Sequence, residues 1–137
     1  MTEHDIQSAI IYLIRLRGGV VTRINSGSML AKSQTDRVYR VQLADKGTSD
    51  IIALYKGVYL AIEVKHGKNT ATPEQIEFLE SVARAGGVGL IAYDVIFVDT
   101  VLNAWDMCYE YFTLKRVEMI EAYIPENKPN RLFIGVE

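Results

Sequence analysis

Three charged residues stand at the ends of two apolar runs: Asp50 precedes Ile51–Tyr55, while Glu63 and Lys65 end the run that begins at Val58. Two carboxylates that meet in an apolar setting cost on the order of several kcal/mol unless their charge is neutralised. A divalent cation does this most directly, since carboxylate oxygens, a backbone carbonyl and waters suit Mg²⁺. With a lysine beside such an ion, the chemistry favoured is attack of water on a phosphodiester.

The two acids meet only if the apolar runs pair as a hairpin. Lys56-Gly57 is suited to a two-residue turn, because glycine adopts a positive φ without strain. This turn opposes Tyr55 with Val58, and the same register opposes Asp50 with Glu63. The sequence therefore predicts that both carboxylates lie on one face of a strand pair.

Lys65 lies two residues beyond Glu63, so strand alternation points both side chains to one face. A structural interpretation remains open: Glu63 and Lys65 form a salt bridge at a strand end, and Asp50 is solvated. His66 alternates to the opposite face, where a surface or packing role is expected.

Apolar periodicity and turn residues predict the elements that position these residues. Thr2 can cap an amphipathic helix that ends at Gly18-Gly19. Thr72-Pro73-Glu74-Gln75 is typical of a helix start, and Gln75 completes a capping box. The other expected elements are strands at 20–24, 49–55, 58–65, 88–93 and 132–136, a possible strand at 38–43, a helix ending near 85 and a helix around 98–109.

This order of elements predicts an α/β fold with a mixed, two-sided sheet flanked by helices. The strands at 20–24, 49–55 and 58–65 can form an antiparallel meander, and the helix from Thr72 to Ala85 can carry the chain to a parallel neighbour. We expect a single domain over residues 1–137, with its core at about 3–95 and a C-terminal extension at about 96–137.

Composition and length are those of one ordinary soluble domain: the chain has 137 residues, of which 49% are apolar and 23% charged. The single cysteine excludes an internal disulfide framework and suits a reducing compartment. The apolar runs are too short for a membrane span, and the acidic start lacks the order of a secretory signal. We therefore expect a cytoplasmic protein without a membrane partner.

The net charge of −2 conceals an asymmetry, because residues 1–68 contain ten basic and six acidic residues and the remainder contains five and eleven. A basic half can present a phosphate-binding face, although scattered solvated charge explains the same count. The candidate nucleic-acid contacts, each a possible partner of a phosphate group, are the basic residues in the strand and loop sequence leading to the acids: Arg23, Lys32, Arg37, Arg40, Lys46 and Lys68.

The run Gly47–Ile52, the tetrad Ile62-Glu63-Val64-Lys65, Gln75 in the next helix and Gly87 before the next strand resemble one nuclease family. It is the VRR-NUC branch of the PD-(D/E)XK nuclease superfamily. The resemblance covers roughly residues 3 to 95 and includes Glu3 and Gln7 in the first helix and the segment Arg23–Gly27. The proline that precedes the first aspartate in the superfamily is replaced here by Ser49.

The resemblance implies a restriction-endonuclease-like core with αβββαβ order, and an Mg²⁺- or Mn²⁺-dependent endonuclease. Asp50, Glu63 and the main-chain carbonyl of Val64 would be metal ligands, and Lys65 the catalytic lysine. Gln75 would be a polar group beside the site, although its capping role also explains it. Glu3 would be an acidic contributor, and Asn25 joins the candidate nucleic-acid contacts. Members of this branch look like small homodimers that act on branched DNA such as four-way junctions.

Two other classes of function compete with this hypothesis. A non-catalytic nucleic-acid-binding module with the same fold would bind DNA in a salt-sensitive manner without needing divalent ions. A structural or assembly protein would not bind DNA at all, even at low salt.

Overall fold

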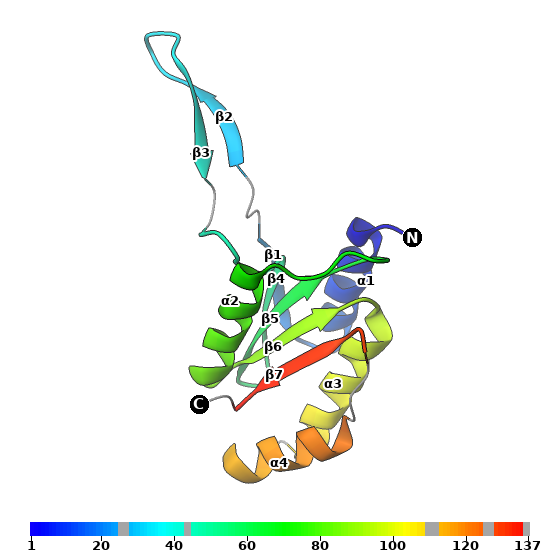
Figure 1. Cartoon of the computed structure of the whole chain (residues 1–137). Helices are drawn as coiled ribbons and strands as arrows, with labels where there is room; N and C mark the ends of the chain where they lie inside the picture. Colours follow the sequence, from blue (N-terminus) through cyan, green and yellow to red (C-terminus); the bar gives the residue numbers. More distant parts are fainter. Residues whose placement is uncertain (25–27, 43–44, 109–112, 125–127, 136–137) are drawn as a thin grey trace.

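The computed structural model describes residues 1–24, 28–42, 45–108, 113–124 and 128–135. A five-stranded mixed sheet flanked by helices forms the body, and a separate two-stranded sheet projects from it (Figure 1). The class is therefore mixed α/β. In chain order the elements are α1 (Glu3–Leu16), β1 (Val20–Arg23), β2 (Ser28–Lys32), β3 (Val38–Gln42), β4 (Ile51–Tyr55), β5 (Val58–Val64), α2 (Pro73–Arg84), β6 (Val88–Ala92), α3 (Val95–Cys108), α4 (Thr113–Tyr123) and β7 (Arg131–Ile134).

The strands of the large sheet follow the order β1-β4-β5-β6-β7. Strands β1, β4 and β5 pair antiparallel, and α2 carries the chain from β5 to the parallel strand β6. This confirms the predicted meander and crossover. Strand β7 adds an antiparallel edge beside β6, so the C-terminal part of the chain completes the same sheet.

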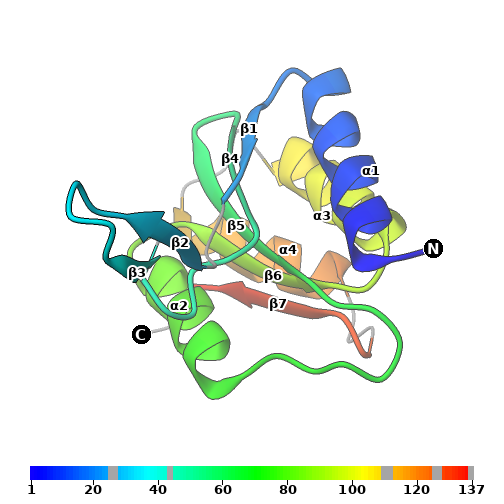
Figure 2. The same cartoon turned by 90° about the horizontal axis from the view of Figure 1, so that it is seen from above.

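Helices cover both faces of this sheet, with α1 and α3 on one face and α2 on the other (Figure 2). The α1/α3 face holds the larger cluster of buried side chains, to which α4 contributes Ile120 and Ile124. The α2 face holds a smaller cluster that includes Ala61, Leu79 and Ile91. Strands β5 and β6 are buried between these layers, which explains why both of their faces are apolar in sequence.

The hairpin of β4 and β5 has the predicted register. Tyr55 pairs with Val58, and the ladder runs to the pair of Ile51 and Ile62. Lys56 has φ 44° and Gly57 has φ 79°. Two positive values at the central positions are typical of a type I′ turn, whose twist matches that of the strands.

Both predicted helix starts are confirmed. The Thr2 side chain accepts a hydrogen bond from the amide of Asp5, whose carboxylate accepts one from the amide of Thr2. The Thr72 and Gln75 side chains form the same reciprocal arrangement at the start of α2. Such boxes satisfy amides that the first turn leaves without partners.

Strand β2 and helix α4 were not predicted. Strand β2 pairs antiparallel with β3, and the two form an arm that stands away from the body (Figure 1). No helix or strand of the body lies against the arm in Figure 1, so the alternation that packing against a neighbour imposes was not expected in its sequence. Among the described helices, none combines the length and the apolar character needed to cross a bilayer.

Candidate metal centre

Asp50 and Glu63 lie just beyond the last residue pair of the β4–β5 ladder, Ile51 and Ile62, at the end of the hairpin remote from its turn. Asp50 precedes Ile51 in the chain, and Glu63 follows Ile62. Asp50 Oδ2 accepts a hydrogen bond of 2.9 Å from the backbone amide of Val64. The carboxylate thus continues the pairing of the two strands through a side chain. This contact fixes Asp50 beside the end of β5.

Glu63 is buried, with a relative exposure of 2%. Its Oε1 accepts a hydrogen bond of 2.8 Å from Gln75 Nε2 and lies 3.5 Å from Lys65 Nζ. Its Oε2 is buried and accepts no hydrogen bond from any described residue. A buried carboxylate oxygen without a donor is rare in folded proteins, because water would otherwise solvate it.

Burial, the largest effect, and the nearby negative charge of Asp50 together raise the pKa of Glu63 to about 8, although the positive charge of Lys65 lowers it. Loss of hydration and a second carboxylate both disfavour the charged form. The ammonium group of Lys65 alone does not neutralise the site. The pair of acids therefore has an excess of negative potential that a cation would relieve.

Lys65 follows β5 and lies on the same side as Glu63, as predicted. Its side chain is 13% exposed, and its amide donates a hydrogen bond of 3.0 Å to the carbonyl of Ala92. This bond holds the lysine against the end of β6. His66 is exposed, in agreement with the expected surface role.

Gln75 combines the two roles that the sequence left open. Its Oε1 accepts a hydrogen bond of 2.9 Å from the Thr72 amide, while its Nε2 donates to Glu63. Because one amide group supplies both an acceptor and two donors, capping and contact with the acid are compatible. The start of α2 is thereby joined directly to the acidic pair.

The loop before Asp50 is seated on the start of α2, a feature that the sequence prediction missed. Gly47 has φ +90°, and a Cβ atom there would lie 2.5 Å from the carbonyl oxygen of Glu74. The Lys46 ammonium lies 3.4 Å from the Glu74 carboxylate. The only sequence signal was the glycine itself, and its reason is a contact made across the fold.

Ser49, which replaces the superfamily proline, is buried, and its Oγ donates a hydrogen bond of 3.1 Å to the carbonyl of Ile51. The serine therefore braces the turn into β4 beside Asp50.

Glu3 lies at the first turn of α1, where its Oε1 accepts a hydrogen bond of 3.3 Å from Asn69 Nδ2. Asn69 belongs to the loop that follows Lys65. No hydrogen bond joins Glu3 to Asp50 or Glu63 in the described part of the chain. Its observed contact is to the loop.

The candidate nucleic-acid contacts are spread over the molecule. Lys46 and Lys68 are exposed in the loops that flank the acids. Arg23 on β1 donates a hydrogen bond of 3.2 Å to Ser8 Oγ. On the arm, the Lys32 ammonium lies 3.5 Å from Asp36, and Arg37 is exposed. Asn25 and the side chain of Arg40 lie outside the described residues.

The donor set fits a hard divalent cation bound by few protein ligands. No group of three or more histidine, cysteine or acidic side chains suited to a metal occurs in the described ranges. Mg²⁺ commonly uses one or two carboxylates and completes its shell with waters and substrate phosphate. The free Oε2 of Glu63 beside Asp50 provides the carboxylate oxygens for such a site.

No protein-family model matches the chain, and no curated protein matches its sequence. The chemistry assigned to the site therefore depends on its own geometry.

Proposed function

We propose that the protein is a metal-dependent DNA endonuclease with a restriction-endonuclease-like core, of the VRR-NUC kind. The observation that carries the proposal is the buried Glu63, whose Oε2 has no hydrogen-bond donor among the described residues while Asp50 and Lys65 stand beside it.

The topology supports this assignment. Apart from the arm, the elements α1, β1, β4, β5, α2 and β6 follow the αβββαβ order that the resemblance implies. The acids lie where β4 begins and β5 ends, next to the start of α2.

Each residue of the site has a definite role in this proposal. Asp50, Glu63 and the main-chain carbonyl of Val64 hold Mg²⁺ or Mn²⁺. When bound, the ion lowers the pKa of a water and stabilises charge on the phosphate. Lys65 donates hydrogen bonds to the nucleophile or to the phosphate oxygens, and Gln75 fixes the orientation of Glu63.

The expected substrate is branched DNA, and the expected assembly is a homodimer that presents two sites. These expectations extend the resemblance, and the experiment below tests the substrate by its panel of DNA structures.

The proposal is tested by measuring cleavage of linear, flapped and four-way DNA with Mg²⁺, Mn²⁺ or EDTA. We expect metal-dependent cleavage, and Glu63→Gln or Lys65→Ala to slow it by about a hundredfold or more. Glu77→Gln, at an exposed position of α2, is the matched control and should retain full activity.

Equal cleavage by the parent and both site variants would overturn the assignment. DNA binding without cleavage, together with no heat on titration of Mn²⁺, would favour the non-catalytic binding module.

A further inference from the structure

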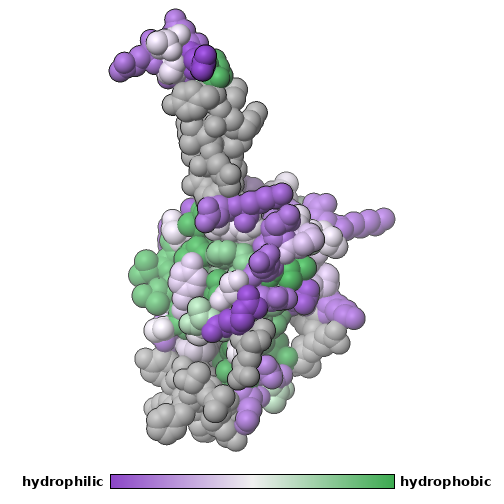
Figure 3. All heavy atoms as spheres, turned by 60° about the vertical axis from the view of Figure 1, so that its left-hand side comes forward, coloured by the Kyte–Doolittle hydropathy of each residue, from purple (hydrophilic) through white to green (hydrophobic). Residues whose placement is uncertain are grey.

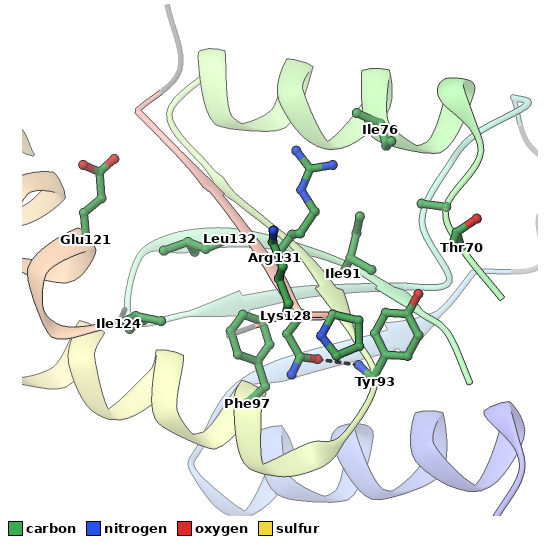
Figure 4. Close-up of a pocket in the computed structure, with 13 residues that line it drawn as sticks. Thr70, Ile76, Ile91, Tyr93, Phe97, Glu121, Ile124, Lys128, Arg131 and Leu132 are labelled. Atoms are coloured by element: carbon green, nitrogen blue, oxygen red, sulfur yellow. Dashed lines mark hydrogen bonds between the residues drawn. The ribbon is translucent and has the colours of Figure 1, made fainter. Parts of the chain in front are cut away.

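A cavity of about 600 Å³ is lined by residues of α2, β6, α4 and β7 and of the loops beside them (Figure 4). Glu63 pairs with Ile91 across β5 and β6, and Ile91 pairs with Arg131 across β6 and β7. Paired residues of adjacent strands share a face. Because neighbouring strands lie about 4.8 Å apart, the backbone of Arg131 is about 10 Å from that of Glu63.

The cavity has an apolar wall and a cationic side. Ile76 of α2, Ile91 and the ring of Tyr93 line it, and Figure 4 shows the Arg131 side chain extending among them toward α2. The guanidinium carbon lies 4.7 Å from the centre of the Phe133 ring. Among the described residues, Arg131 forms no salt bridge, so its charge is available to an anion.

Hydrogen bonds hold the wall in place. The Tyr93 amide donates a hydrogen bond of 2.7 Å to Asn130 Oδ1, and the Tyr93 hydroxyl donates a hydrogen bond to the carbonyl of Asn69. Asn130 is itself buried, and its Nδ2 donates a hydrogen bond of 3.4 Å to Asp94 Oδ2. Tyr93 is thus held by its backbone amide and by its hydroxyl, which suits a ring on which a base stacks.

We propose that this cavity binds one unpaired nucleotide of the DNA strand that is cut, with its base against Tyr93 and Ile76 and its phosphate on Arg131. The inference rests on the proposed function, and it specifies which feature of the substrate is recognised. Arg131 is a substrate-positioning residue.

The cost of extruding a paired base and the size of the cavity both favour an unpaired nucleotide over duplex DNA. A base within a duplex is covered by its stacked neighbours and its partner, and removing it costs a few kcal/mol. A single-stranded flap or tail offers such a base without that cost. The volume falls within the range of about 300–1,000 Å³ typical of ligand pockets.

The acidic residue of the lining lies apart from this subsite. Glu121 belongs to α4 and stands at the opposite end of the cavity from Thr70 and Tyr93 (Figure 4). The anionic phosphate is therefore placed at Arg131 and the base toward Tyr93.

The test measures the affinity of a blunt DNA duplex and of the same duplex with an unpaired oligothymidylate tail, by fluorescence anisotropy in EDTA. The tailed duplex should bind about tenfold more tightly. Arg131→Glu should abolish this preference, and Arg131→Ala should reduce the salt slope by about one.

Arg84→Glu is the control, because Arg84 is an exposed arginine near the end of α2 that pairs with Glu80. It should leave the preference unchanged. Equal affinity of the parent for both duplexes, or equal effects of Arg131→Glu and Arg84→Glu, would overturn the inference. Ala71→Trp, which fills the cavity without changing charge, should also remove the preference, and its failure to do so would exclude the cavity.

Because EDTA removes divalent ions from the binding assay, the measured affinities do not depend on whether the protein cleaves DNA. A tail preference that depends on Arg131 in a protein that never cuts DNA would refute the endonuclease alone. Metal-dependent cutting without any tail preference would refute this subsite alone.

Discussion

At the scale of single residues, Glu63 has the least favourable environment of the site. Its carboxyl group is buried in the sheet and lies next to the carboxylate of Asp50, so its ionisation is costly. In an unfolded chain a glutamate ionises near its ordinary pKa of 4.5, whereas in the fold the pKa of Glu63 is about 8. Between these values unfolding releases a proton. Raising the pH across this window therefore favours the unfolded state.

We predict that the metal-free protein loses stability as the pH rises from about 4.5 to about 8, by at most about 1.4 kcal/mol per pH unit from Glu63. Glu63→Gln should remove this dependence. Urea unfolding in EDTA at several pH values measures it, and parallel curves for both proteins would contradict the prediction.

Divalent ions should act in the opposite direction. Since a cation that binds only the folded state stabilises it by mass action, Mg²⁺ should raise the unfolding temperature of the parent more than that of Glu63→Gln.

Gln75 permits a separation of folding from chemistry. Thr72→Ala and Gln75→Ala each remove half of the capping box, and each should cost about 0.5–2 kcal/mol of stability. Only Gln75 also contacts Glu63, so only Gln75→Ala should reduce metal-dependent cleavage when both variants are assayed fully folded. Equal losses of activity would show that the Glu63 contact has no role in catalysis.

At the scale of elements, the loop before β4 determines where Asp50 lies, and α2 is the surface on which that loop rests. Gly47 meets the backbone of Glu74 and has a positive φ, so a side chain there is opposed both by sterics and by backbone strain. Gly57 has φ +79°, and a Cβ atom there would meet nothing within 4 Å.

We predict that Gly57→Ala costs about 1–2 kcal/mol of stability and leaves activity intact, because strain alone opposes it. Gly47→Ala should cost more and should also reduce cleavage, because the loop must leave α2 and displace Asp50. Chemical denaturation and initial rates measure the two effects. Equal losses of stability and equal cleavage rates for the two variants would show that the loop at Gly47 does not position Asp50.

At the scale of the whole molecule, part of the α2 face of the sheet is left open. Val20, Leu54 and Tyr59 pair in a row across β1, β4 and β5, and their exposures are 73%, 53% and 44%. Apolar surface of the body is visible beside polar side chains in Figure 3. Contiguous exposed apolar side chains are typical of interaction surfaces.

If the protein forms the proposed homodimer through this row, Leu54→Asp should convert it to a monomer. Ile96→Asp, at an exposed position of α3, is the matched control and should not. Light scattering after size-exclusion chromatography distinguishes the two. A parent protein that is monomeric at all accessible concentrations would contradict the dimer.

The sequence by itself determined the hairpin, its register and the two helix starts, because turn residues, capping residues and apolar alternation act over short distances. From these local rules the neighbourhood of Asp50, Glu63 and Lys65 could be predicted. The arm strand β2 escaped prediction because the Ser- and Gly-rich segment around it lacks clear apolar alternation.

Only the tertiary structure decided which distant groups join the acids. The hydrogen bond from Gln75 to Glu63, the seat of Gly47 on α2 and the row from Glu63 to Arg131 all depend on how α2 and β7 meet the sheet. Such contacts are set by packing between segments far apart in the chain, and the apolar periodicity of one segment does not say which other segment it packs against.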